Sequence, residues 1–107
     1  MSWWTAFVLT QAIEIPIYLL GMRRSAIHPA WRLAAAFGAS ALTHPVVWFV
    51  FPELSLPYPA YFALAESFAV LAEWAYLRSF EIPRSGLLAL VANATSATIG
   101  LVLHSLG

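Results

Sequence analysis

The sequence predicts an all-α polytopic integral membrane protein, folded as an up-down bundle of four transmembrane helices with both termini outside. Of its 107 residues, 62% are hydrophobic and 9% are charged, whereas soluble domains carry about 25% charged residues. Four apolar runs are each about 20 residues long, which is the length that crosses the hydrocarbon of a bilayer. The arginines also gather at alternate connectors, as expected for a fixed topology.

The apolar runs are separated by connectors too short to hold an extramembrane domain. Residues 1–107 are therefore expected to form a single transmembrane domain. Short connectors make consecutive helices antiparallel neighbours, which predicts the up-down order. The four expected spans cover about residues 3–22, 30–51, 59–78 and 85–105.

Arginine placement sets the expected orientation. The chain has no lysine, and Arg23, Arg24 and Arg32 flank the first connector, while Arg78 and Arg84 flank the third. Because cytoplasmic loops are enriched in positive charge, these two connectors are expected inside and both termini outside. The first arginines follow the first apolar run, so this run is expected to stay as a span and not to be cleaved as a signal peptide. We expect a multi-pass protein of the cytoplasmic, or inner, membrane of a prokaryote.

Composition also excludes several classes of site and partner. The chain has no cysteine, so it can form neither a disulfide framework nor a thiolate metal site. Its formal net charge is zero and it has no basic cluster beyond the loop arginines, so no nucleic-acid partner is expected. Membrane lipids are the expected surroundings.

Every apolar run carries polar residues at helical spacing on one face. Polar groups left in lipid cost several kcal/mol each, so the four faces are expected to meet in a shared polar interior. The faces comprise Gln11, Glu14 and Tyr18 in the first run, Ser40, Thr43 and His44 in the second, Glu66, Ser67 and Glu73 in the third, and Asn93, Ser96, Gly100 and His104 in the fourth.

Counting the helical rise predicts two polar layers. Glu14, Glu73 and Asn93 are expected roughly 7 to 11 Å from the cytoplasmic ends of their helices, and His44 and Glu66 roughly 18 to 21 Å from them. Because burial disfavours the charged form of a carboxyl group, at least one of the three glutamates is expected to be protonated near neutral pH.

Two prolines follow closely on ionisable residues inside the spans. Pro16 comes two residues after Glu14, and Pro45 comes directly after His44. A proline removes a helix hydrogen bond and frees a carbonyl one turn earlier, which bends the helix. The freed oxygen is either part of a plain structural kink or an extra acceptor beside the buried group.

The leading hypothesis is a transporter-like protein whose polar interior binds or exchanges a cation, either a proton or a divalent metal ion. The cofactor, if any, is unknown beyond that metal ion. The expected metal ligands are His44, Glu66 and Glu73. No catalytic residue is assigned, and the chain is expected not to be an enzyme. The full set of polar-core residues is Glu14, His44, Glu66, Glu73, Asn93, Thr43 and Ser96.

Three alternatives stay open. The buried carboxyl groups could serve only as hydrogen-bonding links between helices. The chain could be a non-catalytic subunit of a larger membrane complex, or an intramembrane enzyme that uses Glu and His as acid and base. Four short helices enclose little volume, so a homo-oligomer or a partner subunit is expected, in contact through small-residue faces such as "AAAFGASA" in the second span.

Four spans in a chain of this length, with a glutamate at position 14 of the first span, resemble the small multidrug resistance transporters. The resemblance covers size and that one residue. This chain differs in its two further membrane glutamates, in the His44–Pro45 pair and in the strong arginine bias of its connectors. No family is assigned on this basis, and no residue role is carried over.

Overall fold

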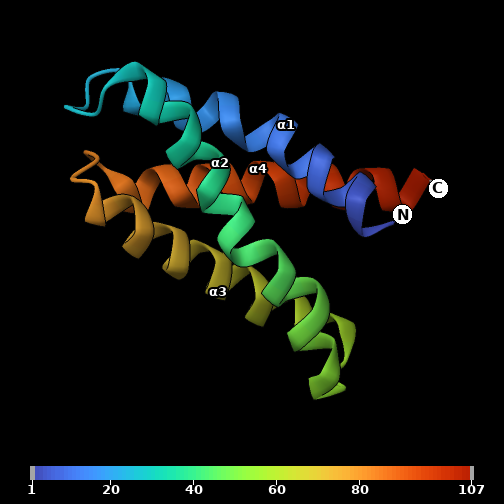
Figure 1. The fold of residues 1–107 in the computed structure, drawn as a ribbon. Coiled ribbons are helices and arrows are strands. Elements are labelled where there is room, and N and C mark those ends of the chain that lie inside the picture. The colour runs from blue at the N-terminus through green and yellow to red at the C-terminus, as the bar shows by residue number, and fades with distance from the viewer. Residues whose placement is uncertain (1, 107) are drawn as a thin grey trace.

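The computed structural model describes residues 2–106, apart from the side chain of His104. Four long α-helices account for most of them: α1 (Trp3–Met22), α2 (Pro29–Pro45), α3 (Tyr58–Ser79) and α4 (Ser85–Leu106). Helix α1 packs on α2 and α4, and α3 packs on the same two helices. The prediction of an all-α four-helix bundle is confirmed (Figure 1).

The two ends of the bundle differ in shape. At one end, which we call the closed end, lie the connectors of residues 23–28 and 80–84 (Figure 1). At the other, the open end, α1 and α4 run together to the two termini, while α3 and the segment that continues α2 lean away from them (Figure 1). The bundle therefore forms a V, with principal extents of 41 × 25 × 19 Å.

Local sequence explains where the first two helices begin. The Ser2 hydroxyl accepts a hydrogen bond from the backbone N–H of Thr5 at 3.1 Å and so caps α1. His28 Nδ1 accepts from the N–H of Ala30 at 3.1 Å, and Pro29 takes the first position of α2, where a missing N–H costs nothing. Arg32 then braces the first connector by donating to the carbonyl oxygens of Ile27 and Ser25 at 2.8 and 3.2 Å.

The prolines affect their helices differently. Pro16 lies inside α1 without ending it. Pro45 is the last residue of α2, and the chain continues as a π-helix over Val46–Val50 and a 3₁₀-helix over Phe51–Leu54. Since proline removes the normal α-helical hydrogen bond, the change of helix type after Pro45 has a direct covalent cause.

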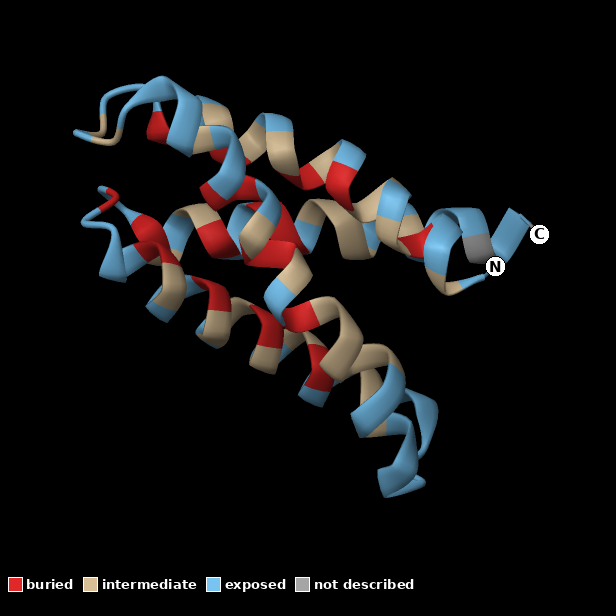
Figure 2. Cartoon of the chain, in the orientation of Figure 1, coloured by how far each residue is buried: buried red, intermediate tan, exposed pale blue. Residues whose placement is uncertain are grey.

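The apolar core lies towards the closed end and contains many small residues. Ala36, Ala39, Ala89 and Ala92 are fully buried and let the helices approach closely; Tyr18, Met22 and Leu77 fill the space between them. Figure 2 shows the buried residues gathered where the four helices meet, and the open end consisting mainly of exposed residues. The helices are therefore packed most closely in the half of the bundle towards the closed end.

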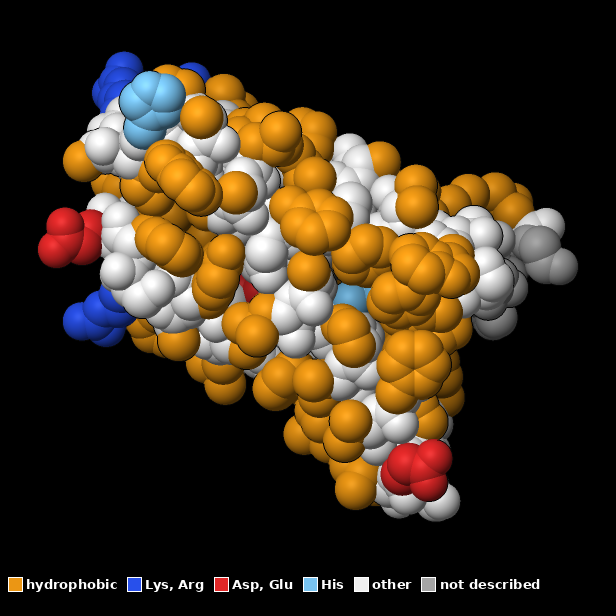
Figure 3. All heavy atoms as spheres, in the orientation of Figure 1, with side chains coloured by type: hydrophobic (Ala, Val, Ile, Leu, Met, Phe, Trp, Pro, Cys, Tyr) orange, Lys and Arg blue, Asp and Glu red, His pale blue; other side chains and the backbone are white. Residues whose placement is uncertain are grey.

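The outer surface is apolar. Large hydrophobic side chains are exposed on every helix, for example Leu20, Phe37, Leu71 and Val102. On the visible face most charged side chains lie at the two ends, and only a small acidic area shows between them (Figure 3). Three helical segments are long and apolar enough to cross a membrane: Trp3–Met22, Pro29–Leu54 and Ser85–Leu103. These findings support a multi-pass membrane protein, although α3, which carries two glutamates, is not among the three segments.

Candidate functional site

The carboxylate of Glu73 on α3 is bonded by side chains from all three other helices. Its Oε1 accepts hydrogen bonds from the Tyr18 hydroxyl of α1 and from the Asn93 amide of α4, the latter at 3.2 Å. Its Oε2 accepts from the Thr43 hydroxyl of α2 at 2.8 Å. Only 1% of the residue is exposed. A single carboxylate on α3 thus bonds to each of the other three helices.

The carboxylate of Glu14 on α1 is held in a similar way but by fewer groups. Its Oε1 accepts from the Ser40 hydroxyl of α2 and its Oε2 from the Ser96 hydroxyl of α4, each at 2.6 Å. The residue is also only 1% exposed. Glu14 and Glu73 lie close enough to interact electrostatically, and Glu14 interacts with Glu66 as well.

Asn93 is fixed by a second contact. Besides bonding Glu73, its Nδ2 donates to the carbonyl oxygen of Ala89, one turn earlier in α4, at 2.8 Å. An amide nitrogen can only donate, so both of its hydrogens are used. The amide is thereby aimed at the Glu73 carboxylate and cannot turn away without losing both bonds.

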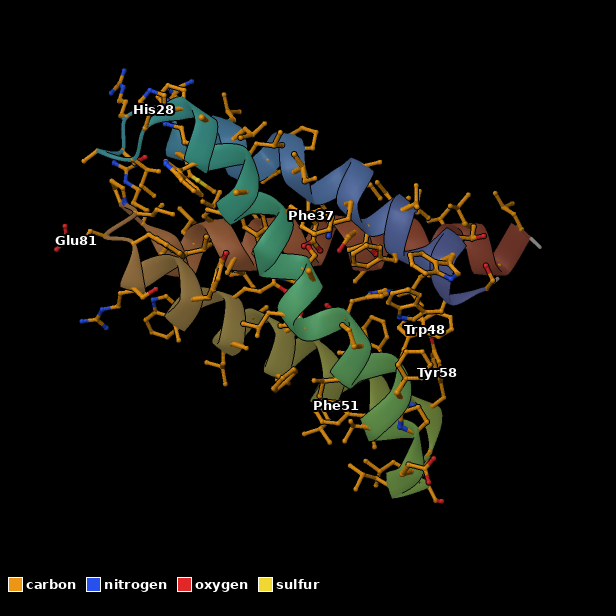
Figure 4. All side chains as sticks on the ribbon, in the orientation of Figure 1. His28, Phe37, Trp48, Phe51, Tyr58 and Glu81 are labelled. Carbon is orange, nitrogen blue, oxygen red and sulfur yellow. The ribbon has the colours of Figure 1, made fainter. Side chains whose placement is uncertain are left out.

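A cavity of about 680 Å³ lies between the helices, with both carboxyl groups in its wall. Its lining runs from Glu14, Glu73 and Asn93 in the middle of the bundle to residues such as Pro52, Tyr58 and Leu101 towards the open end. Figure 4 shows Trp48 and Tyr58, which both line the cavity, on the open-end half of the molecule. None of the described lining residues is an arginine or a lysine.

His44 and Glu66 lie in the walls of the same cavity. Both are partly exposed, and among the described residues neither His44 Nε2 nor the Glu66 carboxylate has a hydrogen-bond partner. The imidazole instead packs among three rings, those of Trp3, Phe7 and Trp48, at centroid distances of 5.7, 5.4 and 5.8 Å. The outer part of the site is therefore polar but unsatisfied.

The expected metal ligands do not converge. Among the described residues, no group of three or more His, Cys, Asp or Glu side chains lies in a position to hold a metal ion. Glu73 is already bonded to three side chains, whereas His44 packs on aromatic rings. A divalent metal ion held by His44, Glu66 and Glu73 thus gains no support from the geometry.

The structure brings most of the predicted polar-core residues together. Glu14, Glu73, Asn93, Thr43 and Ser96 form the bonded inner group, and His44 and Glu66 face the same cavity without bonding to it.

Two members of the inner group were absent from the predicted site, although both lie on the polar faces identified from spacing. Tyr18 donates to Glu73, and Ser40 donates to Glu14. The signal that could have found them is position: Tyr18 is one turn after Glu14, and Ser40 is one turn before His44. Gln11, on the same face as Glu14, donates instead to the carbonyl oxygen of Phe37 on α2 at 3.2 Å.

Compared with protein-family models, with curated proteins and with solved structures, the chain matches none. The resemblance in size and in Glu14 to the small multidrug resistance transporters is therefore not accompanied by a family match. Function has to be argued from the site itself.

Proposed function

We propose that the protein is a four-span membrane protein that binds and releases a proton at the Glu14–Glu73 carboxyl pair, as part of a transporter-like activity. The observation that carries the proposal is the pair itself. Two interacting carboxyl groups, each 1% exposed, lie at mid-height in a chain whose lipid-facing surface is apolar. Two nearby buried carboxyl groups do not readily ionise together, so such a pair holds a proton that can be exchanged.

The cavity supports a transport role more than a purely structural one. Carboxyl groups that only link helices have no need of an adjoining space, yet both members of this pair line a cavity of about 680 Å³. That volume is typical of sites for small organic molecules. Proton exchange at the pair, coupled to the entry of a small solute from the open end, accounts for both features.

A proton fits the site better than a divalent metal ion. The oxygens of Glu73 are already bonded to hydroxyl and amide groups, and no metal-ligand cluster exists among the described residues. A proton needs no coordination shell and only one acceptor oxygen. In the proposed membrane topology, α3 spans the membrane as well and brings the number of spans to four. Both termini and the open end face outside, and the arginine-flanked connectors lie inside. A homo-oligomer remains part of the proposal.

Proton counting on the purified protein tests the proposal. Between pH 9 and pH 5, wild-type protein in detergent is expected to take up about one proton per chain more than the double variant Glu14→Gln/Glu73→Gln, because the variant lacks the pair. Glu53→Gln is the matched control, because Glu53 is an exposed connector residue outside the pair. Equal uptake by wild type and the double variant, with both folded, would refute the proposal.

A further inference from the structure

The two carboxyl groups of the pair are not equivalent in their hydrogen bonds. Glu73 accepts three, and one of the donors is Asn93 Nδ2, an amide nitrogen that can donate a hydrogen bond but cannot accept one. Donors that cannot reverse stabilise the ionised form of a carboxyl group. Glu14 accepts two bonds, both from serine hydroxyls, and a hydroxyl can either donate or accept.

The Ser96 hydroxyl has a choice of acceptors that matters for proton binding. It has one hydrogen, yet two acceptors lie within reach: Glu14 Oε2 at 2.6 Å and the carbonyl oxygen of Asn93, one turn earlier in α4, at 3.2 Å. When the hydrogen points to the carbonyl oxygen, the lone pairs of Ser96 Oγ face Glu14 and can accept from a protonated carboxyl group. Ser96 Oγ and Glu14 Oε2 can thus stay hydrogen-bonded in both the ionised and the protonated state of Glu14 without moving.

Glu73 has no equally good arrangement. The one hydroxyl on its Oε2, that of Thr43, has an alternative acceptor in the carbonyl oxygen of Ser40, but at 3.5 Å. A bond of that length is weak. Its other oxygen, Oε1, accepts from Asn93 Nδ2 and from the Tyr18 hydroxyl, and no second acceptor for the Tyr18 hydrogen lies within reach among the described residues. Protonation of Glu73 would therefore sacrifice hydrogen bonds that protonation of Glu14 keeps.

We propose that Glu14 is the carboxyl group that takes up and releases the proton, that Glu73 stays ionised, and that Ser96 is the positioning residue that adapts to both states. On uptake, a proton from water in the cavity forms an O–H bond at Glu14 Oε2, and the charge of that carboxyl group goes from minus one to zero. The Ser96 hydrogen turns to the Asn93 carbonyl oxygen and Ser96 Oγ accepts from Glu14. Release reverses each step.

The ionisable groups around Glu14 are consistent with one exchangeable proton. From α3 it faces Glu73 and Glu66, and α2 contributes His44 to the same cavity. Tyr18, on α1 itself, donates to Glu73. Helix α4 contributes Ser96 and Asn93, and neither of these side chains ionises in this range.

Infrared difference spectroscopy of the purified protein between pH 9 and pH 5 tests this inference, which rests on the proposed function. All proteins compared carry Glu66→Gln, which removes the third carboxyl group of the cavity. In this background the otherwise unchanged protein is expected to gain one carboxylic-acid C=O stretching band on acidification. Glu14→Gln should remove the band, and Glu73→Gln should keep it. A band that persists in Glu14→Gln and disappears in Glu73→Gln would overturn the inference while leaving the proposed function intact. No titrating band in the otherwise unchanged protein would instead refute the proposed function.

A second pair of variants keeps the test decisive should a glutamate variant fail to fold. Ser96→Ala removes the hydroxyl that bonds Glu14, whereas Thr43→Val removes the hydroxyl that bonds Glu73 at nearly constant shape. The frequency of the band should shift in Ser96→Ala and stay unchanged in Thr43→Val. The opposite pattern would place the proton on Glu73 and overturn the inference.

Discussion

The inner and outer parts of the cavity both contain ionisable side chains, but the two parts differ in how these side chains are hydrogen-bonded. In the inner part, five side-chain donors from three helices satisfy the oxygens of Glu14 and Glu73. In the outer part, His44 Nε2 and the Glu66 carboxylate have no hydrogen-bond partner among the described residues. The inner carboxyl groups are thus fully bonded within the fold, while the outer groups have unused hydrogen-bonding capacity.

The contrast predicts different roles for the two parts: the inner part contributes to the stability of the fold, and the outer part controls access to the carboxyl pair. Buried polar groups that are fully bonded rigidify a structure, whereas unbonded ones do not stabilise it. The inner pair should therefore matter for both folding and proton binding. The outer residues should matter for what reaches the pair, and little for the folded state. Variants in the two parts test this division.

The largest expected effect on stability is that of Glu73→Ala. The substitution leaves three buried donors, those of Tyr18, Thr43 and Asn93, without their acceptor. Unsatisfied buried donors cost about 1 to 3 kcal/mol each in soluble proteins, and hydrogen bonds between membrane helices average about 0.6 kcal/mol. We expect the free energy of unfolding in detergent to fall by about 2 to 4 kcal/mol.

Glu66→Ala is the matched control for Glu73→Ala, because it makes the same change two turns earlier on the same helix. Glu66 bonds to no described side chain, so its removal should lower the free energy of unfolding by less than about 1 kcal/mol. Thermal unfolding of the two variants side by side measures the difference. Equal losses of stability would contradict the division into a structural inner part and an open outer part.

A smaller effect is expected at His44. Its imidazole contacts the rings of Trp3, Phe7 and Trp48, and such ring contacts are worth about 0.5 to 1.5 kcal/mol. We expect His44→Ala to cost about 1 kcal/mol of unfolding free energy, and His44→Phe, which keeps a ring there, to cost close to nothing. If His44→Phe were as destabilising as His44→Ala, the ring nitrogens would be holding the fold, and the outer part would not be free.

Periodicity alone was enough to predict the four-helix fold and the inner polar group. Apolar length marks a membrane helix, and spacing along a helix determines which residues share a face. Glu14, Glu73, Asn93, Thr43 and Ser96 were expected inside for that reason, and all five lie there. The fold and the composition of the interior are properties of single helices, which sequence can reveal.

The hydrogen bonds that side chains form between helices could not be predicted in the same way. That Tyr18 donates to Glu73 and Ser40 to Glu14 depends on the rotation of each helix against its neighbours. The expected metal ligands His44, Glu66 and Glu73 share one cavity but no ligand cluster, because estimates of depth say nothing of distance across the bundle. The π-helix after Pro45 was likewise expected only as a kink.

We expect the carboxyl pair to exchange its proton through the open end of the bundle. This exchange can be measured in vesicles of uniform orientation. Their orientation can be determined by labelling single introduced cysteines, because the chain has no cysteine of its own. Labelling of Ser55→Cys and Ser25→Cys with an impermeant thiol reagent identifies which end faces the bath. Ser55 lies in the connector at the open end, and Ser25 lies in a connector at the closed end.

The decisive measurement then follows the carboxylic-acid infrared band while the pH of one compartment is stepped and the other is held by a trapped buffer. Acidifying the compartment at the open end is expected to raise the band promptly, because the cavity leads from there to Glu14. Acidifying the compartment at the closed end alone should leave the band unchanged at first, since the fully buried side chains of Tyr18, Met22 and Leu77 lie on that side of the carboxyl pair. A band that follows the closed-end compartment instead would contradict the account.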